Sequence, residues 1–163
     1  MTDSRLSFSS MSYKIKDDVR VLNSCLSEWF SNPKILNLVS PTMRYPFKIK
    51  QWINQSYSNQ SNTLVLKLDS WIIGHISFRI NEHKKSAHIF HLIIDPSHKH
   101  KGYGRKLISY AEKLIIRSNL KKITINVLIN NQIARNFYEN NGFTIYRHSK
   151  SGRIKMQKNV GRV

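Results

Sequence analysis

Residues 92–108 read LIIDPSHKHKGYGRKLI, and this stretch decides the fold. An apolar run ends at Ile94, and the loop that follows holds one proline and two glycines. Beyond the loop, apolar residues return at the spacing of one helical face: Leu107, Ile108, Ala111, Leu114 and Ile115. The run ITINVLI at 123–129 has the composition of a strand. This strand–helix–strand order predicts a parallel strand pair with a right-handed crossover.

The loop itself suits a phosphate ligand. A helix N-terminus presents unpaired backbone N–H groups and the positive end of the helix dipole. Gly102 and Gly104 lack a Cβ, so a ligand can approach the backbone closely. The loop lacks the Gly-Lys-Ser/Thr ending of a P-loop and the third glycine of the dinucleotide-binding fingerprint. Taken alone, it predicts either a pyrophosphate site or a solvated basic loop.

The flanking sequence predicts the other elements. A helical stripe of apolar residues predicts a helix over 16–30, which Asn32-Pro33 ends, and a second helix is expected over 47–57. Strands are expected over 6–12, 63–69, 71–80, 87–94, 123–129, 143–148 and 153–158, and a further helix over 131–141. The expected fold is α/β, with the order β-α-α-β-β-β-α-β-α-β-β, a mixed central sheet and one domain over 1–163.

The charge of the chain is strongly positive. Lys and Arg number 27 against nine Asp and Glu, which gives a net charge of +18. Such a surface attracts polyanions, so a weak association with nucleic acid or the ribosome is one expectation. No basic stretch has the spacing of a known nucleic-acid reader, which argues against specific recognition. The pattern does not indicate an oligomeric state.

The single cysteine and the N-terminal residues bear on the cellular compartment of the protein. Cys25 stands alone, so no disulfide can form within the chain, and a metal site is not expected. The polar first residues lack the apolar core of a secretion signal, and no apolar run is long enough to cross a membrane. We therefore expect a cytoplasmic protein with no membrane partner.

The loop resembles the acetyl-CoA motif of the GNAT N-acetyltransferases, which reads roughly (Arg/Gln)-x-x-Gly-x-(Gly/Ala). Gly102 and Gly104 match the motif, whereas Lys99 stands where Arg or Gln is usual. A second block, NQIARNFYENNGF at 131–143, is similar to the family's Asn-x-x-Ala-x-x-hydrophobic-Tyr-x-x-x-Gly-Phe signature. The resemblance covers about 63–160. The front third is looser and is similar to the branch that holds ribosomal-protein N-terminal and small-amine acetyltransferases.

The resemblance implies acetyl-CoA as co-substrate, with no metal, and an acetyl transfer to a primary amine by direct attack in a ternary complex. It implies that Tyr138 hydrogen-bonds to the departing thiolate. The spacing of Ile133, Ala134, Phe137 and Tyr138 also fits a helical core stripe. The family resemblance further implies cofactor contacts from the strand, the loop and the second signature: Leu92, Ile94, Lys99, His100, Lys101, Gly102, Tyr103, Gly104, Arg105, Asn131 and Ala134.

The general base is less clearly marked. Some family members carry a glutamate on the fourth strand, and His88 occupies that place here. An imidazole has a pKa near neutrality and can serve as a base. His91 is a rival, although strand alternation is expected to put it on the opposite face. Glu28, Glu82 and an ordered water are further alternatives, and either histidine could instead be structural.

Three functions from different classes remain open on the sequence. The first is an N-acetyltransferase whose acceptor is a protein N-terminus or a small-molecule amine. The second is an acetyl-CoA-binding domain without catalysis. The third is a basic ribosome- or RNA-associated protein in which the fold is incidental. The intact tyrosine signature favours the first over the second.

Overall fold

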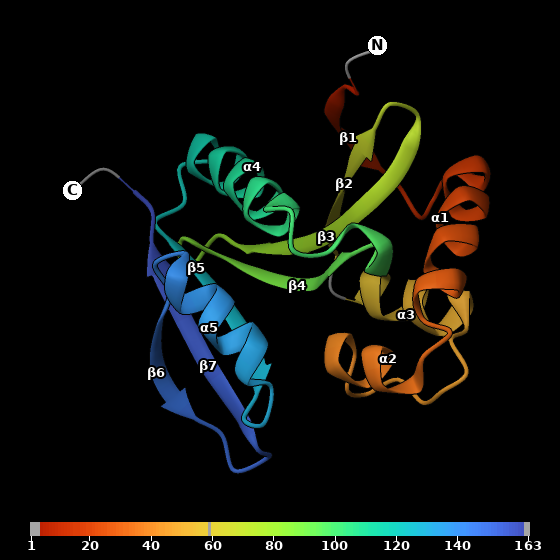
Figure 1. The fold of residues 1–163 in the computed structure, drawn as a ribbon. Coiled ribbons are helices and arrows are strands. Elements are labelled where there is room, and N and C mark those ends of the chain that lie inside the picture. Colours follow the sequence, from red (N-terminus) through yellow and green to blue (C-terminus); the bar gives the residue numbers. More distant parts are fainter. Residues whose placement is uncertain (1–3, 59, 162–163) are drawn as a thin grey trace.

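The computed structural model describes residues 4–58 and 60–161, and one seven-stranded sheet runs through them (Figure 1). The strands are β1 (Leu6–Met11), β2 (Asn62–Leu68), β3 (Trp71–Asn81), β4 (Ser86–Ile94), β5 (Lys122–Leu128), β6 (Thr144–His148) and β7 (Arg153–Asn159). The helices are α1 (Lys16–Trp29), α2 (Pro33–Val39), α3 (Ile49–Ser58), α4 (Tyr103–Arg117) and α5 (Gln132–Asn140), with a short 3₁₀ helix, η1 (Pro96–His98). The sheet order is β1-β2-β3-β4-β5-β7-β6.

The predicted α/β architecture with a mixed sheet is confirmed, but the predicted order lacks one helix. Three helices, not two, lie between β1 and β2. The Asn32 side chain accepts a hydrogen bond of 2.9 Å from the Lys34 amide, and Pro33 occupies the first turn of α2. Proline is tolerated there because that N–H has no helical partner. The Asn-Pro pair therefore ends α1 and also begins α2.

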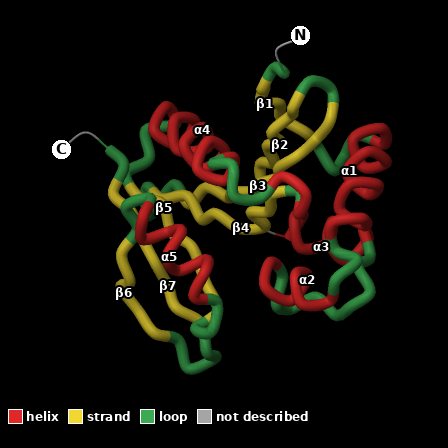
Figure 2. Tube along the Cα trace, in the orientation of Figure 1, coloured by secondary structure: helices red, strands yellow, loops and turns green. Residues whose placement is uncertain are grey.

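The helices cover the two faces of the sheet (Figure 2). On β2, Leu64 and Leu66 belong to the buried cluster that includes residues of α4 and α5. Val65, between them, belongs to the cluster formed with α1, α2 and α3. Because successive strand side chains point to opposite faces, α4 and α5 cover one face and α1–α3 the other. No helix in 4–58 or 60–161 has both the length and the apolar composition to cross a membrane.

The sheet forks between β4 and β5. The two strands pair in parallel only from Ser86 to His88 and from Lys122 to Thr124. Beyond that point, β4 stays hydrogen-bonded to β3 while residues 125–128 of β5 pair with β7. The facing edges of β4 and β5 are therefore not hydrogen-bonded to each other, so their backbone polar groups can meet a ligand.

A bulge in β4 changes the direction of its side chains. Phe90 lies opposite Ser77 and Ile93 opposite His75, so β4 carries one extra residue in this interval. His91 lies inside the bulge, with a left-handed φ of 53°. The expectation that His91 faces away from His88 was wrong, because the bulge breaks the two-residue alternation.

Candidate active site

A cavity of about 370 Å³ opens at the fork. Residues 89–92 of β4 and 125–128 of β5 form two of its walls. Helix α5 contributes a third wall, and residues 38–42, at the end of α2 and just after it, close a fourth. Since the protein does not fill the space between the diverging strands, an extended ligand can enter there and meet both strand edges.

Helix α5 brings the second signature to the cavity. The Asn131 side chain caps the helix by accepting a hydrogen bond of 3.2 Å from the Ala134 amide. Asn131, Ala134 and Tyr138 lie three and four residues apart, which places them on one helical face, and all three line the cavity. Asn131 therefore caps α5 and also borders the cavity.

Tyr138 is half-buried between α5 and the sheet. Its ring packs edge-on against Phe143, with centroids 5.6 Å apart. Burial raises the pKa of Tyr138 well above its usual value. Within 4–58 and 60–161, no residue hydrogen-bonds to its hydroxyl group. A neutral phenol fixed by packing is therefore available as a donor to a ligand in the cavity.

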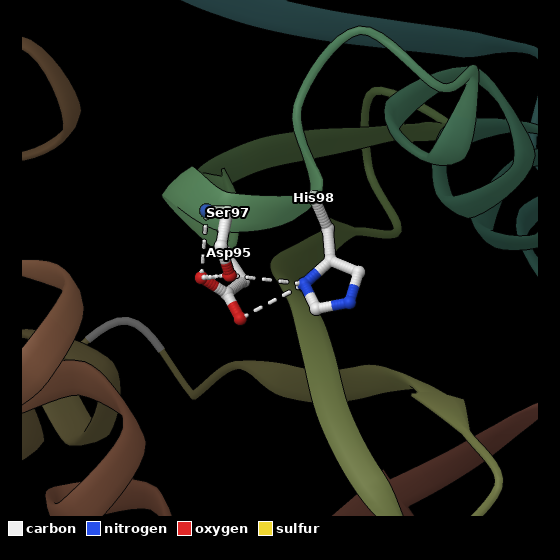
Figure 3. Close-up of polar contacts among 3 residues, drawn as sticks. All are labelled: Asp95, Ser97 and His98. Atoms are coloured by element: carbon white, nitrogen blue, oxygen red, sulfur yellow. Dashed lines mark hydrogen bonds and ion pairs between the residues drawn. The ribbon is translucent and has the colours of Figure 1, made fainter.

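The loop between β4 and α4 begins with a small polar turn (Figure 3). Asp95 Oδ1 accepts hydrogen bonds from the Ser97 amide at 3.0 Å and the Ser97 hydroxyl at 2.9 Å. The other carboxylate oxygen lies 3.0 Å from His98 Nδ1. Asp95 also anchors its own amide to the Ile73 carbonyl. These contacts fix the direction in which the chain leaves the sheet toward α4.

The two glycines of the loop, Gly102 and Gly104, have different structural roles. Gly102 has a φ of 79°, and a Cβ added to it would meet nothing within 4 Å. A Cβ on Gly104 would lie 3.3 Å from a ring carbon of Phe137, so this glycine lets α4 and α5 approach closely. The amides of Tyr103, Gly104 and Arg105 find no hydrogen-bond partner among the described residues. This combination of open space and unpaired N–H groups suits an anion.

His88 lies where the pairing of β4 and β5 ends. Its Nδ1 is 2.9 Å from Thr124 Oγ1. Burial, then the positive charges of Arg79 and Lys155, lower the pKa of His88 to about 4. The imidazole is therefore neutral near pH 7. A base role requires that Nδ1 donate to Thr124, which leaves Nε2 free to accept a proton.

His91 has a structural setting. Its ring stacks on Trp52 at 3.7 Å, and its Nε2 donates to Gln55 Oε1 at 3.0 Å. Burial lowers the pKa of His91 to about 3. Gln55 in turn bonds to Ser40 and Thr42, so it ties the segment after α2 to β4. His91 thus holds the wall of the cavity that α2 and α3 provide.

The structure brings some of the predicted site residues together and separates others. Five of them line the cavity: His88, Leu92, Asn131, Ala134 and Tyr138. Ile94 and the loop residues Lys99, His100, Lys101, Gly102, Tyr103, Gly104 and Arg105 lie outside its lining, toward the start of α4. Glu28 is exposed on α1 and Glu82 lies in the β3–β4 turn, and neither lines this cavity. Among the described residues, no group of three or more His, Cys, Asp or Glu could hold a metal ion.

The cavity also contains residues that the sequence did not mark as site residues, among them Gln55, Arg79 and Arg153. Arg79 faces His88 directly across the β3–β4 hairpin. Counting back from the turn between the predicted strands 71–80 and 87–94 would have found that pair, because cross-strand partners are fixed by the turn. Gln55 and Arg153 reach the cavity through tertiary packing, and no local pattern marks them.

Residues 27–143 match the model of the acetyltransferase (GNAT) family. A spermidine N(1)-acetyltransferase of Thermoplasma acidophilum is 31% identical over 111 residues, which are 60% of this chain and 68% of that protein.

Two solved structures share the fold. The spermidine N-acetyltransferase of Vibrio cholerae, in complex with CoA and spermine, has a TM-score of 0.75 and 22% identity, covering 95% of both chains. The ribosomal-protein-S18-alanine N-acetyltransferase of Escherichia coli has a TM-score of 0.72 and 15% identity, covering 98% of this chain and 96% of that one.

Proposed function

The chain belongs to the acetyltransferase (GNAT) family, and from this premise we propose how it moves an acetyl group from acetyl-CoA to a primary amine. The observation that carries the proposal is the cavity at the β4–β5 fork, with the Tyr138 side chain in its wall. The amine attacks the thioester directly while both substrates are bound. Holding the two reactants side by side supplies a large part of the rate acceleration.

Acetyl-CoA lies along the fork in this proposal. The pantetheine arm runs between β4 and β5, beside the backbone of Leu92 and Ile94 and the α5 residues Asn131 and Ala134. The pyrophosphate sits at the open space over Gly102, where it accepts hydrogen bonds from the unpaired amides that begin α4. The exposed cations Lys99, Lys101 and Arg105 reach the outer phosphates, with His100 and Tyr103 beside them.

The reaction then has few requirements. The amine nitrogen forms a bond to the acetyl carbon, the carbon–sulfur bond breaks, and the nitrogen loses a proton. Unpaired amides on the edge of β4 donate to the thioester oxygen as it gains negative charge. Tyr138 donates a hydrogen bond to the departing sulfur, which leaves as the CoA thiolate and then takes up a proton from water to give the thiol. His88 accepts the proton of the amine, directly or through a water molecule.

The setting of the one cysteine supports direct transfer rather than an acetylated enzyme. Cys25 is half-buried on α1 and is not among the residues that line the cavity. Burial, then Glu28 and Asp95, raise the pKa of its thiol. A nucleophilic cysteine requires the opposite shift, toward the thiolate.

The release of free CoA thiol from acetyl-CoA tests this function, with a panel of peptides, polyamines and other small amines. We expect turnover with at least one class of amine, and initial-rate lines that intersect when both substrates are varied. Parallel lines would contradict direct transfer. Binding of CoA without thiol release on any amine would instead favour a non-catalytic acetyl-CoA-binding domain.

A further inference from the structure

A second cavity, of about 670 Å³, adjoins the first. It lies against strands β3, β4, β5 and β7, and it shares Arg79, His88 and Asn126 with the cavity at the fork. The two spaces therefore meet beside His88, where the pairing of β4 and β5 ends. A ligand can place one end in the fork and the other in the second cavity.

Cations dominate both cavities. Of the described residues that line the fork cavity, Arg79 and Arg153 carry full positive charge, and none is Asp or Glu. The second cavity adds Lys84, Lys122 and Lys155, against the single carboxylate of Glu82. The acceptor side of the fork is thus electropositive at short range, in addition to the positive charge of the whole chain.

These cations are not needed for the phosphates of CoA. The proposed pyrophosphate site is the loop over 99–105, and no residue of that loop lines either cavity. Arg79 instead lies directly across from His88 on the neighbouring strand, and Lys155 pairs with Asn126 on β5. Both positive charges act on His88, since each contributes to lowering its pKa. Both positive charges therefore act where the two cavities meet.

We propose that the acceptor is an amine that also carries an anionic group, a carboxylate or a phosphate, which binds at Arg79 and Lys155 while the amine reaches the fork. This inference rests on the proposed acetyl transfer. A polyamine would place its second ammonium among these cations, and no carboxylate among the described residues lines the fork cavity to receive it. An anionic group instead gains charge-assisted hydrogen bonds from the guanidinium and the ammonium.

The same charges suit the chemistry. An amine must lose its proton before it attacks, and nearby positive charges favour the neutral form over the ammonium. An acceptor whose anionic end binds these cations therefore presents a more reactive, neutral nitrogen. An acceptor whose ammonium binds a protein carboxylate would instead keep its proton. The spermidine acceptor of the Thermoplasma acidophilum relative is thus not the class of acceptor that this site fits.

Four amines of similar length test the inference: 4-aminobutyrate, 3-aminopropyl phosphate, butylamine and 1,4-diaminobutane. The readout is kcat/KM from thiol release. We expect at least one anionic amine to exceed butylamine by about tenfold, and the diamine to be the poorest. The better of the two anionic amines identifies the group as carboxylate or phosphate. A native protein that prefers the diamine would overturn the inference.

Substitutions at Arg79 and Lys155 test where the anionic group of the acceptor binds. Arg79→Gln and Lys155→Gln should each lower the ratio of anionic amine to butylamine by about tenfold, through KM rather than kcat. Arg117→Gln, at the exposed end of α4, is the matched control and should keep the native ratio. Arg79→Glu should move the preference toward the diamine. An equal loss on all four amines in the Arg79 and Lys155 variants would contradict the assignment.

An equilibrium measurement separates this inference from the proposed function. Each amine is titrated calorimetrically into protein saturated with CoA, and circular dichroism of each variant checks that it is folded. If no amine releases thiol, the proposed transfer fails. The anion site is still supported if an anionic amine binds more tightly than the others and Arg79→Gln weakens that binding. Equal binding of all four amines, or tighter binding of the diamine, would overturn it.

Discussion

The two sides of the fork are built in different ways. The proposed cofactor side consists of one loop and one helix, and its proposed contacts lie within short segments, 99–105 and 131–138. The proposed acceptor side draws Gln55, Arg79, His88 and Arg153 from α3, β3, β4 and β7. The first side presents mainly backbone amides and one phenol, whereas the second presents charged and polar side chains from segments far apart in the chain.

The difference follows from what each side has to recognise. A pyrophosphate can be held by N–H groups, so that side needs a helix start and glycines at fixed spacing. Recognition of an acceptor depends on side chains placed by tertiary structure. Changes on the cofactor side should therefore affect every acceptor alike, and changes on the acceptor side should depend on the amine.

The largest expected effect concerns Tyr138. Tyr138→Phe keeps the ring that packs on Phe143 but removes the donor to the sulfur. We expect kcat to fall by about 100-fold or more with every amine, while the KM for acetyl-CoA changes by less than about twofold. Tyr110→Phe is the control, because Tyr110 stacks on Phe8 away from the fork. Unchanged turnover in Tyr138→Phe would remove this residue from the mechanism.

Substitution of Gly102 tests the proposed pyrophosphate site in the loop before α4. Gly102→Ala puts a methyl group into the open space over the loop, and the KM for acetyl-CoA should rise by about tenfold, which corresponds to about 1.4 kcal/mol. Gly152→Ala is matched to it, with a φ of 77° and the same open space at its Cβ. Both variants bear the same backbone strain, so a similar KM in the two would place the pyrophosphate elsewhere.

Substitution of His88 should have a smaller effect on kcat, because its pKa of about 4 makes the imidazole a weak base. We expect His88→Gln to lower kcat by roughly fivefold to tenfold, less than the range for a well-matched base. His148→Gln, exposed on β6, is the control. A loss of roughly 1,000-fold would show that His88 is a strong base, and no loss at all would leave deprotonation to water.

The buried histidines should make the acceptor side sensitive to acid. His75 donates from Nδ1 to the His91 carbonyl at 2.8 Å and accepts from Tyr13 at Nε2, at 2.9 Å. Burial lowers the pKa of His75 to about 4 and that of His91 to about 3. The unfolded chain, with histidine pKa values of about 6.5, binds protons that the folded chain does not. The free energy of unfolding should therefore fall as pH drops from about 6.5 toward 4.

Urea unfolding at pH 7 and pH 5 measures this dependence. Each of the two histidines contributes up to about 1.4 kcal/mol per pH unit in that interval. His91→Phe keeps an aromatic ring on Trp52 and removes one titrating group, so its pH slope should be smaller by about that amount. An unchanged slope would mean that His91 is protonated in the folded protein.

The helices and strands around the proposed cofactor side could be predicted from the sequence far better than the side chains of the proposed acceptor side. Runs of branched and aromatic residues located the strands of 4–58 and 60–161, and the cap at Asn131 is a local feature that the sequence can reveal. Helix α2 was missed because Asn32-Pro33 ends one helix and begins another. The orientation of His91 was missed because a bulge depends on the pairing with β3. Arg153 and Gln55 reach the cavity through packing, which no local pattern reveals.

The central claim is that the β4–β5 fork seats acetyl-CoA with its sulfur at Tyr138. A crystal structure of the protein with CoA tests it most directly. The account predicts the thiol within hydrogen-bonding distance of the Tyr138 hydroxyl, the pantetheine between β4 and β5, and the pyrophosphate on the amides of residues 102–105. CoA phosphates in the second cavity, beside Arg79 and Lys155, would contradict both the cofactor site and the acceptor proposal.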